Sequence, residues 1–269
     1  MINCGITGHR GNLGKKFQTV AKNFKFIKFK GDIRKVKDIE DWIKKENFDL
    51  IIHFAAIVPI SVVNKKYNDA IKVNYLGTKN LVDAILKYRP NIKWFFYSST
   101  SHVYKYSKKK IKESSKLEPI SKYGKTKLMG ENYIIKKLKN KKIKFCIGRI
   151  FSIIDNKNKE FFLKGLIRKI KVKDKFIKLE NLNHYRDFVS TDQVSRAILL
   201  LWRKKHHGII NIASGKKTNL KDIARVFAKK NKKKIYFNNN VATSVLANIK
   251  KLKKYGWRQD NLNFVRYFQ

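Results

Sequence analysis

Short apolar runs alternate along the chain with longer segments in which apolar residues recur every three or four positions. The short runs predict buried strands, which read as brief continuous apolar stretches. They fall at Met1–Thr7, Phe24–Phe29, Leu50–Phe54, Ile92–Ser98, Lys144–Ile150 and Gly208–Ala213. The longer segments predict amphipathic helices at Leu13–Lys22, Val36–Glu46, Asp69–Lys87, Lys122–Lys137, Thr191–Lys204 and Leu220–Lys230. This alternation predicts an α/β protein with a doubly wound parallel sheet.

Charge adds little to that picture. The chain has 64 lysine and arginine residues against 19 acidic ones, a formal net charge of +45. The basic residues are spread over the whole sequence and build no single stripe interleaved with aromatic residues, as a dedicated nucleic-acid site would. We therefore expect a generally cationic surface that suits anionic small molecules, and no specific nucleic-acid partner.

Length and composition indicate a compact cytoplasmic protein. With 43% hydrophobic residues and three prolines, 269 residues suffice for one large α/β domain with a small companion lobe. No apolar run approaches the roughly 20 residues that span a bilayer, so we expect no membrane span. The opening MINCGIT reads as a strand without an export signal. Cys4 and Cys146 fall in apolar runs, as reduced buried thiols do.

A glycine-rich turn, TGHRGNLG, follows the first predicted strand and opens a predicted helix. Gly8 and Gly11 permit a tight turn and let the backbone approach phosphate groups, while Gly14 lets the helix pack on its strand. The helix amino terminus offers free N–H groups and a positive dipole end to an anion. The turn therefore predicts a Rossmann-like dinucleotide site. Its expected contacts are Gly8, Arg10, Gly11, Asn12, Leu13 and Gly14.

A second constellation places hydroxyl and phenol groups near that site. The segment SSTSHVY, with Thr100 at its third position, is followed by Tyr123 and Lys127. A Tyr-x-x-x-Lys pattern is uninformative in so lysine-rich a chain, and Tyr104, Tyr106 and Tyr133 match it too. Only Tyr123 opens a helix one loop after the strand that leads to Thr100. Because one helical turn separates Tyr123 from Lys127, the ammonium can hold a cofactor ribose and lower the phenol pKa.

Together these segments resemble the extended short-chain dehydrogenase/reductase family, which includes sugar-nucleotide epimerases, dehydratases and reductases. Within it, the pattern is most similar to the dTDP-4-dehydrorhamnose reductases. The similarity rests on the short interval from Gly14 to Asp32 and on the run from Glu113 through Pro119 and Tyr123 to Glu131. Further matching segments are HFAA (53–56), VNYLGTKNL (73–81), RDFVSTDQV (186–194), NIASG (211–215) and KKYGW (253–257).

The resemblance implies roles for individual residues. Thr100 is the substrate-binding hydroxyl, Tyr123 the catalytic acid and Lys127 its partner, which also contacts the cofactor. Asp32 and Ile33 are implied on the adenine side. Further implied cofactor contacts are Phe54, Ala55, Ala56 and Asn74. The implied substrate contacts beside Thr100 are Ser101, His102 and Arg186.

The residues after Thr100 narrow the expected reaction. Sugar-nucleotide 4,6-dehydratases place an acidic pair there, because eliminating water needs an extra acid/base group, and related decarboxylases need the glutamate. Here Ser101 and His102 stand instead, which argues against both. His102 either lines the pocket wall, the interpretation we favour, or acts as an acid/base in an epimerisation. His53 ends a buried strand, where packing is the expected role.

Cofactor choice depends on the second strand. NAD-preferring folds place an acid there to bond the ribose 2′-hydroxyl, whereas a basic residue suits a 2′-phosphate. The strand reads FKFIKFK with no acid before Gly31, and Arg10 lies in the glycine turn. Arg10 and Lys30 therefore predict NADP(H) as the preferred cofactor, with NAD(H) as the alternative. His184, His206 and His207 have no carboxylate or cysteine at metal-ligand spacing, so we expect no metal.

These observations predict a domain division and a function. Residues 1–150, joined by 187–215, form the NAD(P)-binding domain. Residues 151–186 and 216–269 form a small C-terminal substrate-binding lobe, with an amphipathic helix at Phe161–Ile170. We expect NADP(H)-dependent reduction of a 4-keto deoxy nucleotide sugar in surface polysaccharide precursor synthesis, with a homodimer as a candidate assembly. The alternatives are a nucleotide-sugar 4-epimerase with tightly bound NAD, and a regulatory subunit with vestigial catalytic groups.

Overall fold

The computed structural model describes residues 1–58, 60–154, 162–238, 241–260, 262 and 264. Six parallel strands form its central sheet, in the order β10-β5-β4-β3-β1-β2. Each lies within two residues of a predicted strand, and the predicted α/β doubly wound fold is confirmed. The strands are β1 (Ile2–Thr7), β2 (Phe24–Lys28), β3 (Leu50–His53), β4 (Trp94–Thr100), β5 (Lys144–Ile150) and β10 (Gly208–Ile212).

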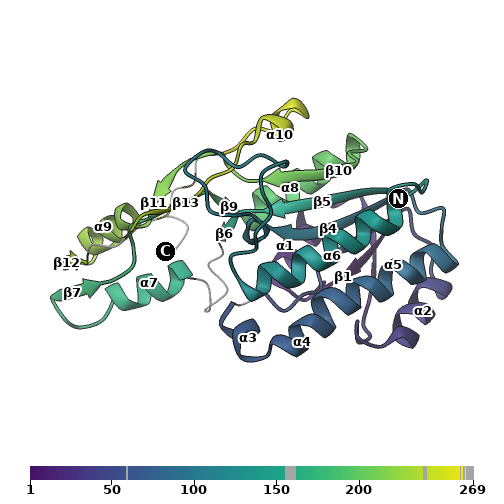
Figure 1. Cartoon of the computed structure of the whole chain (residues 1–269), viewed down its shortest axis with the longest axis horizontal. Coiled ribbons are helices and arrows are strands. Elements are labelled where there is room, and N and C mark those ends of the chain that lie inside the picture. The colour runs from purple at the N-terminus through teal and green to yellow at the C-terminus, as the bar shows by residue number, and fades with distance from the viewer. Residues whose placement is uncertain (59, 155–161, 239–240, 261, 263, 265–269) are drawn as a thin grey trace.

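Both faces of the sheet are buried, as the continuous apolar runs require. Trp94 and Phe96 of β4 enter the core on one face, and Phe95 and Tyr97 enter the core on the other. Helices lie on each side (Figure 1). Those against the first face are α1 (Asn12–Val20) and α8 (Thr191–Arg203), and those against the second are α2 (Val36–Lys45), α5 (Gly77–Tyr88) and α6 (Lys122–Leu138).

The predicted helix at Asp69–Lys87 is interrupted. It consists of α4 (Tyr67–Ile71), a π-helical turn η1 (Lys72–Leu76) and α5, and it is preceded by a short helix, α3 (Ile60–Lys65), that the pattern does not predict. A π-helical turn widens one turn of a helix and often occurs at functional sites. No helix in the described part of the chain is long and apolar enough to cross a membrane.

A second, smaller core lies apart from the sheet, on the left of Figure 1. The predicted amphipathic helix is α7 (Phe162–Ile170); Phe161 lies outside the described residues. It packs with α9 (Leu220–Lys230) and the paired strands β7 (Phe176–Leu179) and β12 (Lys234–Phe237). Short strands connect this region with the sheet: β6 (Ser152–Ile154), β8 (His184–Arg186), β9 (Phe188–Ser190), β11 (Thr218–Asn219) and β13 (Thr243–Val245).

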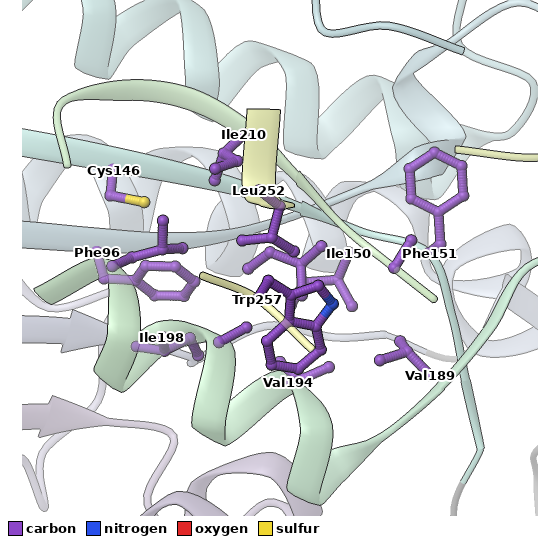
Figure 2. Close-up of a cluster of buried hydrophobic side chains, with 14 of the residues drawn as sticks. Phe96, Cys146, Ile150, Phe151, Val189, Val194, Ile198, Ile210, Leu252 and Trp257 are labelled. Carbon is purple, nitrogen blue, oxygen red and sulfur yellow. The ribbon is translucent and has the colours of Figure 1, made fainter. Parts of the chain in front are cut away.

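The carboxyl-terminal segment departs from the expected division. We expected all of 216–269 in the small lobe, but Leu252 of α10 (Lys250–Lys254) and Trp257 pack into the core of the main sheet. Figure 2 shows both side chains beside Val194 and Ile198 of α8. The reason is burial: Leu252 and Trp257 are 0% and 6% exposed, and α8 offers the apolar surface that covers them.

Candidate active site

The glycine turn lies where the strand order reverses. The chain runs from β1 outward to β2 and then returns to β3 on the other side of β1. Open α/β sheets bind ligands at the carboxyl ends of the strands at such a point, and we call this edge of β1 and β3 the crevice. Gly8 has a φ of +69°, and a Cβ there would lie 2.6 Å from the Ala55 nitrogen. The Ala55 N–H donates to Thr7 Oγ1 at 3.2 Å. The two predicted cofactor loops, 8–14 and 54–56, therefore meet.

The amino terminus of α1 is open at this crevice. Gly11 is its N-cap and contributes no side-chain hydrogen bond, so the first-turn amides of Asn12 and Leu13 have no side-chain cap. The Gly11 N–H donates to the Gly8 carbonyl at 3.1 Å, which closes the turn. A Cβ on Gly14 would overlap that same carbonyl, whereas a Cβ on Gly11 would touch only the Gly8 oxygen, at 3.3 Å. Gly11 thus borders open space.

Basic side chains gather beside the turn. Burial lowers the pKa of His9, and the nearby charges of Arg10, Lys28 and Lys30 lower it further. Arg10 and Lys30 are both exposed, so they lie at the surface near the end of β2. The carboxylate of Asp32 is already paired: Arg34 donates to it at 2.6 Å, and this hydrogen bond lowers the pKa of Asp32 to about 2.

Ile33 and Asn74 support the crevice from behind. Ile33 is buried, and a Cβ on Gly77 of α5 would lie 2.9 Å from its side chain. Asn74, in the π-helical turn, is fully buried. Its Oδ1 accepts from the Ile57 N–H at 2.7 Å, and its Nδ2 donates to the Ile57 carbonyl and to Thr126 Oγ1, both at 3.0 Å. The side-chain amide of Asn74 thus hydrogen-bonds both backbone groups of Ile57, and it fixes the conformation of the loop at 54–58.

His53 is a satisfied core residue. Thr7 Oγ1 lies 2.6 Å from its Nδ1, and its Nε2 lies 2.9 Å from Thr78 Oγ1. Because the Thr78 hydroxyl donates to the Asn74 carbonyl, it accepts from Nε2–H, and Nδ1 accepts from Thr7. Burial, with a smaller effect from Lys127, lowers the pKa of His53 to about 3. The ring is therefore neutral at physiological pH.

The hydroxyl-rich segment SSTSHVY begins at the end of β4, the strand that neighbours β3 in the sheet. Thr100 is 6% exposed, and its Oγ1 accepts from the His102 N–H at 3.2 Å, which caps the 3-10 turn η2 (Ser101–Val103). Ser101 is buried beside it. The β4 strand thus brings Thr100 and Ser101 to the carboxyl edge of the sheet, as predicted.

His102 packs against the start of α6. Its Nδ1 lies 3.1 Å from Ser121 Oγ, and that oxygen accepts from the Gly124 N–H at 3.0 Å. The ring and the helix cap are thus joined by one hydrogen bond through the Ser121 hydroxyl. Burial lowers the pKa of His102 to about 4, and the charge of Arg186 contributes. His102 is therefore neutral at physiological pH and packs against the N-cap of α6, in keeping with the expected role of lining the pocket wall.

Tyr123 and Lys127 lie on one face of α6, a helix that packs against β4 and the turn η2. The His102 and Tyr123 ring centroids are 6.1 Å apart. Burial raises the pKa of Tyr123, contrary to the expected lowering by Lys127. The physical reason is that the Lys127 ammonium lies over the ring of Tyr97, 4.0 Å from its centroid. Burial of the Tyr123 phenol is therefore not compensated by a nearby positive charge. Burial also lowers the pKa of Lys127 to about 7, an effect that the charge of Glu131 opposes.

Arg186 reaches the same region from a distant part of the sequence. It lies on β8, where its Nη1 donates to the Tyr185 carbonyl at 2.9 Å and to Thr243 Oγ1 at 3.2 Å. Burial lowers the pKa of its guanidinium. Its positive charge lowers the pKa of His102, so Arg186 lies near that ring.

Asp187 is a site residue that sequence reasoning missed. Its carboxylate accepts from the Ser214 N–H and hydroxyl at 2.8 and 2.7 Å, the Gly215 N–H at 2.9 Å and the Ala247 N–H at 3.3 Å. It therefore ties the junction between β8 and β9 to the NIASG turn and to the segment before α10. The available signal in the sequence was an acid directly before the apolar pair Phe188 and Val189. Among the described residues, no group of three or more potential metal ligands comes together.

This doubly wound sheet, with a glycine turn at its switch point and a Tyr-x-x-x-Lys helix beside it, has the architecture of the extended short-chain dehydrogenases/reductases. The model of the NAD dependent epimerase/dehydratase family matches residues 6–213. The chain therefore belongs to that family, as its motifs predict.

Curated relatives are named as 4-epimerases. The chain is 28% identical over 272 residues to a putative UDP-glucose 4-epimerase of Methanocaldococcus jannaschii, across 94% of this chain and 83% of that protein. It is 33% identical over 151 residues to a UDP-glucose 4-epimerase of Lactobacillus helveticus, but this alignment spans only 55% of this chain and 42% of the relative.

Solved structures share the fold. The dTDP-4-dehydrorhamnose reductase of Bacillus anthracis, in complex with NADP, superposes with a TM-score of 0.82 at 19% identity, over 96% of this chain and 94% of that one. The UDP-glucose 4-epimerase of Thermus thermophilus, in complex with NAD, gives a TM-score of 0.80 at 18% identity over the same shares. At this identity the likeness concerns the fold alone, and it includes both reductases and epimerases.

Proposed function

We propose that this chain is a nicotinamide-dependent enzyme of nucleotide-sugar metabolism that reduces a 4-keto group with NADPH. The observation that carries the proposal is that the start of α6, which bears Tyr123 and Lys127, packs against the end of β4 and the turn η2, next to Thr100. The open amino terminus of α1 follows β1 at the same carboxyl edge of the sheet. The kinship with nucleotide-sugar enzymes supports the substrate class.

The residues present fit a dinucleotide. The close approach of Gly8 to the 54–55 backbone, and the open space at Gly11, leave a cradle that a Cβ would fill. The uncapped amides of α1 suit a pyrophosphate, and Lys127 suits the nicotinamide ribose. When bound, NADPH supplies a hydride to the keto carbon. Tyr123 then donates its phenol proton to the carbonyl oxygen, and Thr100 orients that oxygen by a hydrogen bond.

The preference for NADP(H) rests on the cations at the end of β2. The charges of Arg10, Lys28 and Lys30 act on His9, and the first two acids after β2 are engaged, Asp32 by Arg34 and Asp38 by the Asp32 N–H. A ribose 2′-phosphate would meet several positive charges there, whereas a 2′-hydroxyl would find no free carboxylate. Solved neighbours include complexes with NADPH and with NAD, so the choice depends on these side chains of this chain.

The preference predicts a charge-dependent loss. The double substitution Arg10→Ala with Lys30→Ala should weaken NADPH binding by about tenfold or more, since a hydrogen bond to a charged group contributes about 1.5–3 kcal/mol. NADH binding should change little. Isothermal titration of both cofactors measures this, with Lys25→Ala, an exposed lysine of β2 near its amino end, as the control. Equal affinities for the two cofactors in the unaltered protein would contradict the preference.

A 4-epimerase is the second candidate. The observation in its favour is the alignment with the Methanocaldococcus jannaschii protein over most of the chain. An epimerase would oxidise C4 and return the hydride to the opposite face, which requires tightly held NAD and a sugar free to rotate. The cationic cluster beside the glycine turn favours the reductase instead.

Two assays separate the candidates. Loss of NADPH absorbance on addition of a 4-keto-6-deoxy nucleotide sugar is expected for the reductase. Interconversion of UDP-glucose and UDP-galactose without net cofactor turnover, together with NAD released on denaturing the purified protein, would establish the epimerase and overturn our proposal. The absence of both activities, with cofactor binding retained, would indicate a regulatory subunit.

We also propose a cytoplasmic location, which the two free buried cysteines fit.

A further inference from the structure

A buried ion pair lies directly behind the proposed catalytic residues. Arg149 of β5 donates through Nη2 to Glu131 Oε2 at 2.7 Å and through Nε to both carboxylate oxygens at 3.1 Å. The Arg149 and Glu131 side chains are only 2% and 0% exposed. The Ser99 hydroxyl donates to the same carboxylate. So complete a set of partners is what a buried carboxylate needs to stay ionised.

Glu131 contacts both elements that carry the site. On α6 it follows Tyr123 and Lys127 at intervals of four residues, so the three side chains share one face of the helix. Its partner Ser99 immediately precedes Thr100 on β4. Glu131 therefore connects the helix that presents the phenol and the ammonium with the strand that presents the hydroxyl.

The guanidinium of Arg149 has further partners besides Glu131. Its Nη1 donates to the Glu113 carbonyl at 3.0 Å, and its guanidinium lies over the Tyr104 ring, 4.7 Å from the centroid. The guanidinium is thus shared between Glu131 and the loop after β4. This places the negative partner of the pair, not the positive one, on the helix face of Lys127.

The other titratable groups around Lys127 are neutral near pH 7. His53 faces it from β3, and burial holds the pKa of His53 at about 3. Tyr97 faces it from β4, with the ammonium over its ring, and Tyr123 precedes it by one turn of α6; burial raises the pKa of both phenols. Burial likewise disfavours the Lys127 ammonium, and among the described residues Glu131 supplies the charge that favours it.

We propose that Glu131 is a positioning residue that keeps Lys127 in its charged form and holds the Thr100 strand against α6. The effect of Glu131 on turnover rests on the proposed function, because Lys127 acts in catalysis only if that function is correct. The effect of Glu131 on the charge of Lys127 does not rest on it, because it depends on residues of this chain alone. Arg149, in this arrangement, restrains the carboxylate and partly offsets its charge.

The direct test is a titration of Lys127 in the cofactor-free protein. Carbon-13 labelling of the lysine side chains lets their pKa values be followed by NMR, and one resonance is expected to titrate near pH 7 while ordinary lysines titrate near 10.4. Lys127→Arg removes that resonance and assigns it. Glu131→Gln should lower its pKa by about one unit or more, as expected from losing an opposite charge one helical turn away.

Arg149→Gln is the matched variant, and the expected shift has the opposite sign. It leaves Glu131 without its counter-charge, so the pKa of Lys127 should rise. A purely structural role for the ion pair would leave the Lys127 titration unchanged in every folded variant, and that result would overturn the proposal. The double variant Glu131→Gln with Arg149→Gln removes both charges and leaves no uncompensated buried ion. It should lower the pKa of Lys127, but by less than Glu131→Gln alone.

The double variant also carries the test if Glu131→Gln alone does not fold. With a substrate in hand, the alkaline limb of the kcat/KM profile should move in the same directions as the NMR titration. An unchanged titration with normal turnover would refute the role of Glu131. Shifted titrations in a protein that neither binds cofactor nor turns over substrate would refute the proposed function and leave the role of Glu131 standing.

Discussion

At the scale of single residues, burial sets the chemistry of this site. His53 and His102 have pKa values of about 3 and 4 because their rings are desolvated, so neither is charged at neutral pH. Burial also keeps Tyr123 protonated. A phenol that retains its proton at neutral pH suits a proton donor, and this agrees with reduction as the proposed direction of the reaction.

Tyr123→Phe tests the proton donor. The substitution removes only the hydroxyl, so cofactor binding should persist while kcat falls by about 10²–10⁴-fold, the contribution of a positioned acid. Tyr133→Phe is the matched control. Tyr133 lies ten residues further along α6, and its hydroxyl donates to Asp83 at the back of the helix.

Tyr133→Phe should leave turnover almost unchanged. Steady-state rates on a confirmed substrate, with cofactor affinity measured in parallel, distinguish the two variants. Near-normal turnover by Tyr123→Phe would remove Tyr123 from the mechanism and leave the crevice without its proton donor.

At the scale of elements, helix amino termini divide into capped and open ones. Ser121 caps α6, Asn219 caps α9, and Ser190 with Gln193 forms a reciprocal capping box on α8. Helix α1 instead begins after Gly11, with no side-chain cap, at the point where the sheet order reverses. Capping stabilises a helix by about 0.5–2 kcal/mol, so its absence at α1 leaves amides that a phosphate can satisfy.

Two glycine substitutions separate binding from folding in this element. Gly11→Val places its side chain in the open crevice at an ordinary φ of −68°, so the melting temperature should change little while NADPH binding is lost. Gly14→Val forces its Cβ into the Gly8 carbonyl, so it should destabilise the fold itself.

Differential scanning fluorimetry with and without NADPH measures both effects. The expected pattern is a normal melting temperature without a cofactor-induced rise for Gly11→Val, and a lowered melting temperature for Gly14→Val. Unchanged NADPH affinity in Gly11→Val would show that the pyrophosphate does not bind at this turn.

At the scale of the whole molecule, charge is the dominant feature. Surface acids are largely matched to lysines, as Asp49 is to Lys93 and Glu118 to Lys105, which leaves a large cationic excess around them. Such a surface attracts anions over distances of about one Debye length, roughly 8 Å at physiological salt. Both proposed ligands are anions, so the excess favours their approach without specifying either.

The excess predicts weak, unspecific binding of nucleic acid. Duplex DNA should bind with a Kd of about 10⁻⁴–10⁻⁶ M near physiological salt, equally for unrelated sequences, and affinity should fall linearly with the logarithm of salt concentration. Fluorescence anisotropy with two unrelated duplexes across a salt series measures this. A complex that prefers one sequence and persists at physiological salt would contradict our view that the cationic surface is generic.

The sequence by itself determined the features that depend on local interactions. All six strands of the sheet, the helices against them and the glycine turn follow from apolar periodicity and short motifs, because each is specified by residues close in the chain. The Tyr-x-x-x-Lys helix was likewise predictable once position selected Tyr123 from the other matches. Short connecting strands such as β8 and β13 carry too few residues to show a period.

Only the tertiary structure decided what depends on residues distant in sequence. It brought Arg186 to His102, buried Asp187 among the amides of the NIASG turn, and placed Trp257 in the core of the main sheet. It also paired Glu131 with Arg149. It placed the Lys127 ammonium over Tyr97, so burial raises the pKa of Tyr123 and Lys127 does not lower it. Desolvation and long-range pairing arise only when the chain has folded, and they shift the pKa values of His53, His102, Tyr123 and Lys127.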